Sequence, residues 1–174
     1  ARITEALGRL VQTVYNKLSY IDTAMGESDI RKMFRSTNRL SLDLNGTAEA
    51  NSHALDDVLQ FIATNTHMHM KTSMKTVKDR FMKAPYGFVE DDVHWLIARL
   101  FKRGDLAFTV NGVVVNQNNK TEEELISYIT KKTFAEKLLL EERIRVNDKE
   151  KKAVRDVMKE LFGIAGVAED EDSI

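Results

Sequence analysis

The residues best suited to bind a charged ligand are lysines and arginines in the middle of the chain. They are Lys71, Lys75, Lys78, Arg80, Lys83, Arg99, Lys102 and Arg103. The first five face a single nearby carboxylate, Asp79, so positive charge is in local excess. Such groups can contact nucleic-acid phosphates, and binding of that kind weakens as salt rises. The same pattern is also typical of a solvated lysine face, and the last three cations can complement a helix C-terminus.

Three carboxylates argue against DNA as the ligand of this region. Glu90, Asp91 and Asp92 stand at the expected start of a helix that follows the first five cations. In the usual docking of a helix-turn-helix, the N-terminal residues of the second helix approach the base edges. Carboxylates there would meet phosphate repulsion, although acidic residues also suit any helix N-terminus. We therefore interpret the region mainly as a protein-contact element, with DNA binding as the alternative.

The segment His67-Met68-His69-Met70 has metal-ligand character, because imidazole and thioether groups suit soft ions such as Cu(I). Two histidines supply only part of a coordination shell, and the chain has no cysteine. We expect no metal site, but a loop or strand with Met68 and Met70 packed inward.

Nucleotide and hydrolase motifs are missing from the sequence. It has no Walker phosphate loop, no Gly-x-Ser-x-Gly elbow and no His-Glu-x-x-His helix. We expect no catalytic residue and no cofactor site in this chain, so a stand-alone enzyme is the weakest of the functional hypotheses.

The sequence predicts that the elements carrying these cations form one compact unit. A basic helix over 71–83 leads into the turn Ala84-Pro85-Tyr86-Gly87, and a second helix over 89–103 is stopped by Gly104. Pro85 disfavours helix at the residue before it, Gly87 allows a tight turn, and Tyr86 and Phe88 should cover the junction of the helices. Trp95 should lie at or near the edge of the core.

A hairpin follows the second helix. Apolar runs at 106–110 and 113–115 flank Asn111-Gly112, and Asn-Gly is a strong signal for a two-residue type I′ turn. Helix, turn, helix and β-ribbon are the parts of a winged helix-turn-helix.

Helices are expected on both sides of this unit. Before it, an amphipathic helix is marked by apolar residues at spacings of three and four: Ile3, Leu7, Leu10, Val11, Val14, Leu18 and Ile21. Ser28 is expected to cap a short helix, a brief strand is expected at 40–44, and a helix over 48–66. After it, capping boxes predict helices from about 122, 134 and 148: Thr121 with Glu124, Thr133 with Glu136, and Asn147 with Glu150. Gly163 is the expected cap of the last helix.

The sequence thus predicts a mainly α protein with a winged helix-turn-helix at its centre, flanked by further helices. We divide it into an N-terminal helical segment (1–47), a winged helix-like domain (48–117) and a C-terminal helical segment with an acidic tail (118–174). The formal net charge is -1, with 43% hydrophobic and 30% charged residues, so no overall field attracts nucleic acid or membrane. The first residue already lies in a helical pattern, so we expect a piece of a longer polypeptide, and the absence of cysteine fits a cytoplasmic setting.

One stretch resembles a known family. It runs Phe81-Met-Lys-Ala-Pro-Tyr-Gly-Phe88 and continues through an apolar helix to Gly104-Asp-Leu106. This pattern resembles a region outside the nucleotide-binding module in the large P-loop ATPases of BREX-type bacterial anti-phage systems. The resemblance implies a subunit of a multi-protein phage-exclusion machine, with other protein subunits as partners and with ATP bound in a part of the parent outside this chain. It transfers no site residues, because the family's nucleotide motifs have no counterpart here.

Overall fold

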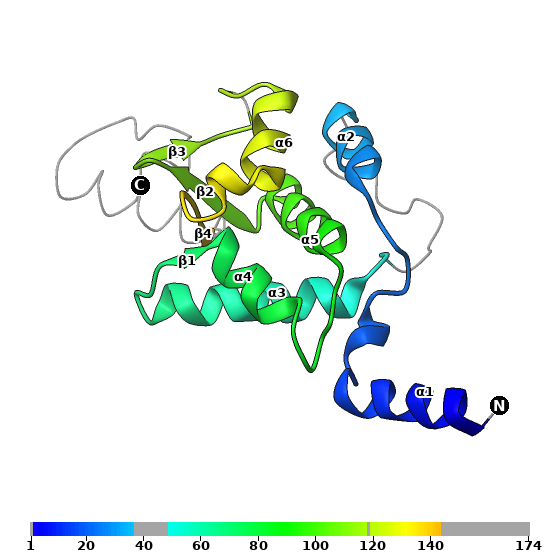
Figure 1. The fold of residues 1–174 in the computed structure, drawn as a ribbon. Coiled ribbons are helices and arrows are strands. Elements are labelled where there is room, and N and C mark those ends of the chain that lie inside the picture. Colours follow the sequence, from blue (N-terminus) through cyan, green and yellow to red (C-terminus); the bar gives the residue numbers. More distant parts are fainter. Residues whose placement is uncertain (1, 37–48, 118, 144–174) are drawn as a thin grey trace, which may run out of the picture. The chain divides into compact units, whose positions relative to one another are not determined.

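The computed structural model describes residues 2–36, 49–117 and 119–143. These residues form six α-helices, two 3-10 helices and four strands (Figure 1). The helices are α1 (Arg2–Val14), η1 (Leu18–Tyr20), α2 (Glu27–Arg35), α3 (Ser52–His67), α4 (Met74–Phe81), α5 (Glu90–Arg103), α6 (Glu122–Thr130) and η2 (Lys132–Phe134). The strands are β1 (Thr72–Ser73), β2 (Leu106–Val110), β3 (Val113–Val115) and β4 (Leu138–Glu142). All the described residues belong to one compact unit. The strand predicted at 40–44 and the helix predicted from 148 to Gly163 lie outside the described residues.

The predicted winged helix-turn-helix is confirmed. Helix α4 leads through the turn at Pro85 into α5, and the hairpin of β2 and β3 follows (Figure 1). Asn111 and Gly112 have φ of 52° and 80°, and Val110 lies opposite Val113, as a two-residue turn with two left-handed positions requires. Gly104, with φ of 82°, ends α5 as predicted.

The sheet contains two strands that the sequence analysis did not predict. Its order is β1-β4-β2-β3, with antiparallel pairing throughout. The helix expected from about 134 is wrong: η2 is a single 3-10 turn, and β4 follows it. Five residues of β4 pair with β2, with Phe108 opposite Leu140, so long-range pairing overrides the local capping pattern of Thr133 and Glu136.

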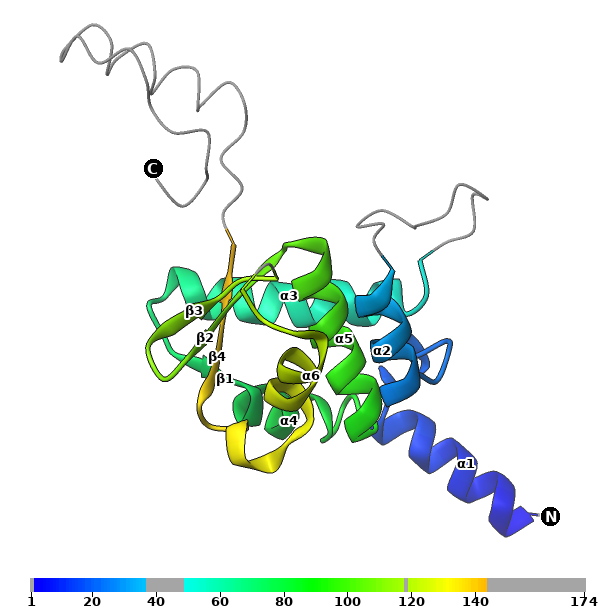
Figure 2. The same cartoon turned by 90° about the horizontal axis from the view of Figure 1, so that it is seen from above.

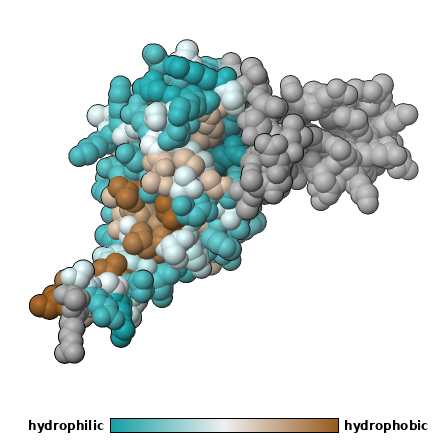
Figure 3. All heavy atoms as spheres, turned by 90° about the vertical axis from the view of Figure 1, so that its right-hand side faces the viewer, coloured by the Kyte–Doolittle hydropathy of each residue, from teal (hydrophilic) through white to brown (hydrophobic). Residues whose placement is uncertain are grey.

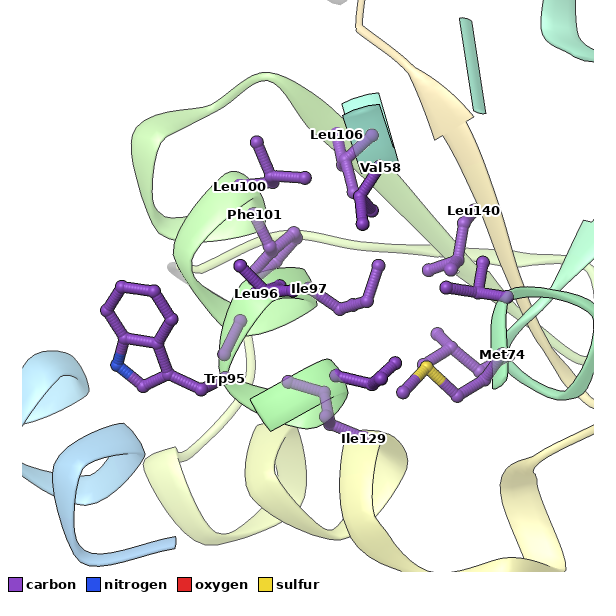
Figure 4. Close-up of a cluster of buried hydrophobic side chains, with 14 of the residues drawn as sticks. Val58, Met74, Trp95, Leu96, Ile97, Leu100, Phe101, Leu106, Ile129 and Leu140 are labelled. Atoms are coloured by element: carbon purple, nitrogen blue, oxygen red, sulfur yellow. The ribbon is translucent and has the colours of Figure 1, made fainter. Parts of the chain in front are cut away.

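The core lies between the helices and the inner face of the sheet. Alternating residues of β2 and β4, including Leu106, Phe108 and Leu140, are buried. The rings of Phe101 on α5 and Phe108 on β2 stack with 3.9 Å between their centroids. Figure 4 shows that α3, α4, α5, α6 and both central strands contribute side chains to this one cluster.

Several predicted boundaries are wrong at residue level. The first helix stops at Val14 rather than near Ile21, and a turn and η1 follow. The short second helix begins at Glu27, so Gly26 is its N-cap and Ser28 lies inside it. The basic helix begins at Met74 and ends at Phe81, so Lys71 precedes it and Lys83 follows it.

The prediction that Met68 and Met70 pack inward is wrong. Their side chains are 63% and 49% exposed. The segment is the end of α3: His69 adopts φ of 56°, and the amides of His69 and Met70 donate to the carbonyls of Thr66 and Asn65. This is a Schellman motif, which turns the chain away from the helix and leaves the side chains after it in solvent.

Candidate interaction surface

The turn between α4 and α5 is held by aromatic packing, as the sequence predicts. The ring of Tyr86 lies 4.5 Å from that of Phe81 and 5.3 Å from that of Phe88, measured between centroids. Its hydroxyl donates to Asp57 of α3 over 2.9 Å, which ties the turn to the helix beneath it. Gly87 has φ of 67°, and a Cβ built there would lie 2.5 Å from Cδ1 of Tyr15. The turn therefore needs glycine both for its backbone conformation and for the close approach of the chain after α1.

Helix α5 occupies the position of a recognition helix, yet it is covered by other parts of the chain. Helices α2 and α6 both pack against it, and Figure 2 shows both of them beside it. Of its 14 residues, only Asp91 is exposed. Trp95 is only 7% exposed and points toward α2 (Figure 4), so it belongs to the core edge predicted for it. Little of α5 is therefore accessible from solvent.

The three carboxylates at the start of α5 have separate tasks. Glu90 accepts a hydrogen bond from Lys78 of α4 over 2.8 Å, and that bond lowers the pKa of its carboxyl. Asp92 is buried and accepts from the backbone amide of Met25 over 2.8 Å; burial raises the pKa of Asp92. Asp91 is left at the surface. Two of the three thus fasten neighbouring segments to α5.

The cations on and after α4 are engaged with groups of the same chain. The Nζ of Lys75 is hydrogen-bonded to Glu136, and this bond raises the pKa of the lysine. The guanidinium of Arg80 lies 4.8 Å from the centroid of the Phe61 ring, and the Nζ of Lys83 lies 3.6 Å from Asp79. Because Lys75 and Lys83 are largely exposed, their ion pairs are weak, and another anion could replace the carboxylate in each pair.

The cations of α5 serve the fold. Arg99 and Arg103 both bind Glu49, over 2.8 Å and 2.7 Å, and Arg103 also binds Asp105. Lys102 is buried and donates to the carbonyl of Ser36 over 2.9 Å. These three predicted contacts for nucleic acid therefore hold α5 to the segments before α3 and after α2.

A buried histidine stands next to the Lys78–Glu90 pair. His94 is 5% exposed, and its Nε2 lies 3.8 Å from Oε1 of Glu90 with no hydrogen-bond partner among the described residues. Burial and the nearby charge of Lys78 lower the pKa of His94, which favours the neutral imidazole.

Around the helix-turn-helix, exposed residues lie on the wing, on the outer face of α4 and on the connection that carries Lys71. The wing has no cation between 106 and 117, and its Val113 and Val114 are exposed by 61% and 53%. We call the wing and the outer face of α4 the wing surface. Sequence reasoning missed the cover over α5, although the apolar residues Ile30 and Ile129 that supply it stood at helical spacings.

The sequence of this winged helix matches a known protein family. Residues 15–144, most of the chain, match the family model described as the winged helix-turn-helix domain of the BREX ATP-binding protein BrxC. The chain belongs to this family. Helices α2 and α6 and strand β4 lie inside the matched range, so the cover over α5 is part of the BrxC winged helix domain, whereas α1 precedes it. No solved structure matches the chain.

Within 2–36, 49–117 and 119–143, no group of three or more histidine and acidic side chains is arranged to hold a metal ion. None of the helices in those ranges combines the length and the apolar character needed to cross a membrane.

Proposed function

We propose that this chain is a non-catalytic interaction module of a large P-loop ATPase in bacterial phage defence, and that it acts through contacts with other protein subunits in the cytoplasm. The parent would bind ATP outside this chain. The observation that carries the proposal is the enclosure of α5, which leaves only Asp91 exposed on the helix that would read DNA.

The wing itself supports the same conclusion. Electrostatic attraction to phosphates depends on cations, and the wing supplies none while exposing Val113 and Val114. Exposed aliphatic side chains with few charges are typical of the core of a protein interface. The wing is therefore better suited to a protein partner than to a nucleic acid.

DNA binding by α4 is the second candidate, and a specific observation favours it. Lys71 precedes α4, Lys75 lies on it and Lys83 follows it; all three are exposed, and the acids that bind Lys75 and Lys83 are themselves exposed. Such pairs contribute little to stability, so phosphates could replace the acids. This mode would be salt-dependent and independent of DNA sequence.

Titration of labelled duplex DNA at several salt concentrations separates the two candidates. The variant is Lys71→Glu/Lys75→Glu. The control is Arg9→Glu/Lys32→Glu, which makes the same change in charge at exposed side chains of α1 and α2. At moderate salt we expect no DNA binding by wild type, variant or control. At low salt we expect the same weak response from all three proteins. Binding that falls steeply with salt, with a slope reduced by about 2 in the Lys71/Lys75 variant alone, would instead establish phosphate contacts.

A further inference from the structure

Helix α1 carries an apolar face that the rest of the described chain does not cover. Ile3, Leu7, Leu10 and Val14 are exposed by 77%, 57%, 58% and 43%, and none of them belongs to the core cluster. Every residue of the helix from Ile3 to Val14 is exposed. In Figures 1 and 2 the helix projects away from the body, and Figure 3 shows apolar residues along that projection, at the lower left. We call these four residues the α1 stripe.

The spacing of the α1 stripe is that of a coiled-coil seam. The intervals of four, three and four residues place Ile3 and Leu10 at d positions and Leu7 and Val14 at a positions of two heptads. If a second α1 runs antiparallel, Ile3 meets Val14 of the other copy and Leu7 meets Leu10, and each pair occurs twice about one dyad. This is the self-complementary contact that a two-fold dimer requires. We propose that the α1 stripe binds the α1 stripe of a second copy of this chain in an antiparallel pair.

The charges of α1 are compatible with self-pairing. The positions that flank the seam are Thr4, Ala6, Val11 and Thr13, all uncharged. Glu5 and Arg9 lie on the outer face and bind each other over 2.8 Å. Like charges therefore do not meet across the dyad, and the flanks select no charged partner.

The size of the helix sets the strength of the pair. Its 13 residues make it about 20 Å long. A stable dimer interface covers roughly 800 Å² on each partner, more than one face of so short a helix offers. The pair is accordingly weak, reversible and dependent on concentration.

The anchorage of α1 favours the antiparallel direction. Its C-terminal end is fixed to the body, because the amide of Lys17 donates to the carbonyl of Pro85 over 3.0 Å and the ring of Tyr15 lies against Gly87. A parallel pair would bring two bodies together at that end. An antiparallel pair separates them by the length of the helix. This inference concerns a surface apart from the wing and stands whether or not the proposed function holds.

Sedimentation equilibrium of the whole chain, from about 10 μM to about 1 mM, tests the pairing. The disrupting variant is Leu7→Glu/Leu10→Glu. The matched control is Gly8→Glu/Gln12→Glu, which adds the same two charges to the outer face, where a side chain at Gly8 meets nothing within 4 Å. We expect wild type and control to approach twice the monomer mass as concentration rises, and the disrupting variant to stay monomeric with an unchanged thermal melt. Wild type that stays monomeric throughout, or a disrupting variant that dimerises equally, would overturn the proposal.

Disulfide trapping tests whether the two helices run antiparallel. The chain has no cysteine of its own, so only the introduced thiols can form a cross-link. Ile3→Cys mixed with Val14→Cys should give a cross-linked dimer of the two variants, while each alone should not. Positions 3 and 14 are about 16 Å apart along a helix, well beyond the separation of about 7 Å that a disulfide tolerates. Equally rapid linking of Ile3→Cys to itself would show that the antiparallel arrangement is wrong.

Discussion

Gly87→Ala is the substitution that tests the turn of the winged helix most directly. The glycine has φ of 67°, and its ideal Cβ would lie 2.5 Å from Cδ1 and 3.0 Å from Cε1 of Tyr15. The left-handed backbone costs about 1–2 kcal/mol for any residue with a Cβ. Displacing the Tyr15 ring costs about 1–3 kcal/mol more, as overpacking does elsewhere. We therefore expect a loss of roughly 2–5 kcal/mol in the free energy of unfolding.

A double-mutant cycle with Tyr15→Ala separates the two causes. In the Tyr15→Ala background the contact is gone, so Gly87→Ala should cost only the backbone contribution of about 1–2 kcal/mol. Gly112→Ala is the matched control, because Gly112 has φ of 80° and nothing within 4 Å of its ideal Cβ. It should likewise cost about 1–2 kcal/mol.

Urea unfolding followed by circular dichroism measures these differences. An equal cost of Gly87→Ala with and without Tyr15 would refute the close contact between the turn and the chain after α1. An unchanged midpoint for Gly87→Ala in both backgrounds would refute the left-handed turn itself.

Two further predictions concern histidines. The pKa of His94 is lowered by burial, so the unfolded chain takes up a proton at pH ~6.5 that the folded chain takes up only at lower pH. The free energy of unfolding should then fall as pH drops, by up to about 1.4 kcal/mol between pH 7.5 and 5.5. His94→Gln should remove this part of the pH dependence in urea unfolding; the same dependence in both proteins would show that His94 titrates normally. His69 holds φ of 56° at the end of α3, so His69→Gly should raise stability by about 1 kcal/mol. A lower melting temperature for His69→Gly would contradict the assigned cap.

Much of the winged helix could be predicted because its signals are local. Asn111-Gly112 has few ways to join two apolar strands, and Gly104 ends α5 by adopting a conformation that other residues avoid. The capping box of Thr121 and Glu124 forms as expected, with the threonine hydroxyl accepting from the amide of Glu124 and the carboxylate from that of Thr121. Each of these features depends on residues within a few positions of one another.

The same local reasoning failed where distant residues decide. Thr133 and Glu136 have the spacing of a capping box, but Glu136 binds Lys75 and the following residues pair with β2. The surroundings of the candidate site residues are likewise set by distant groups. Composition marked eight cations as possible phosphate contacts, yet Lys102 is buried and Arg99 and Arg103 bind Glu49. Charge along a sequence does not reveal which acids lie opposite it in the fold.

The sequence by itself determined where the chain turns, which helices begin and end near those turns, and that a wing follows α5, because backbone conformation depends on neighbouring residues. Only the tertiary structure decided that α2 and α6 enclose α5 and that β4 enters the sheet between β1 and β2. It also decided that the α1 stripe, with the same spacing as a core helix, lies in solvent. The physical reason is that an apolar face specifies burial but not the partner, and the partner is selected by long-range packing among all the elements together.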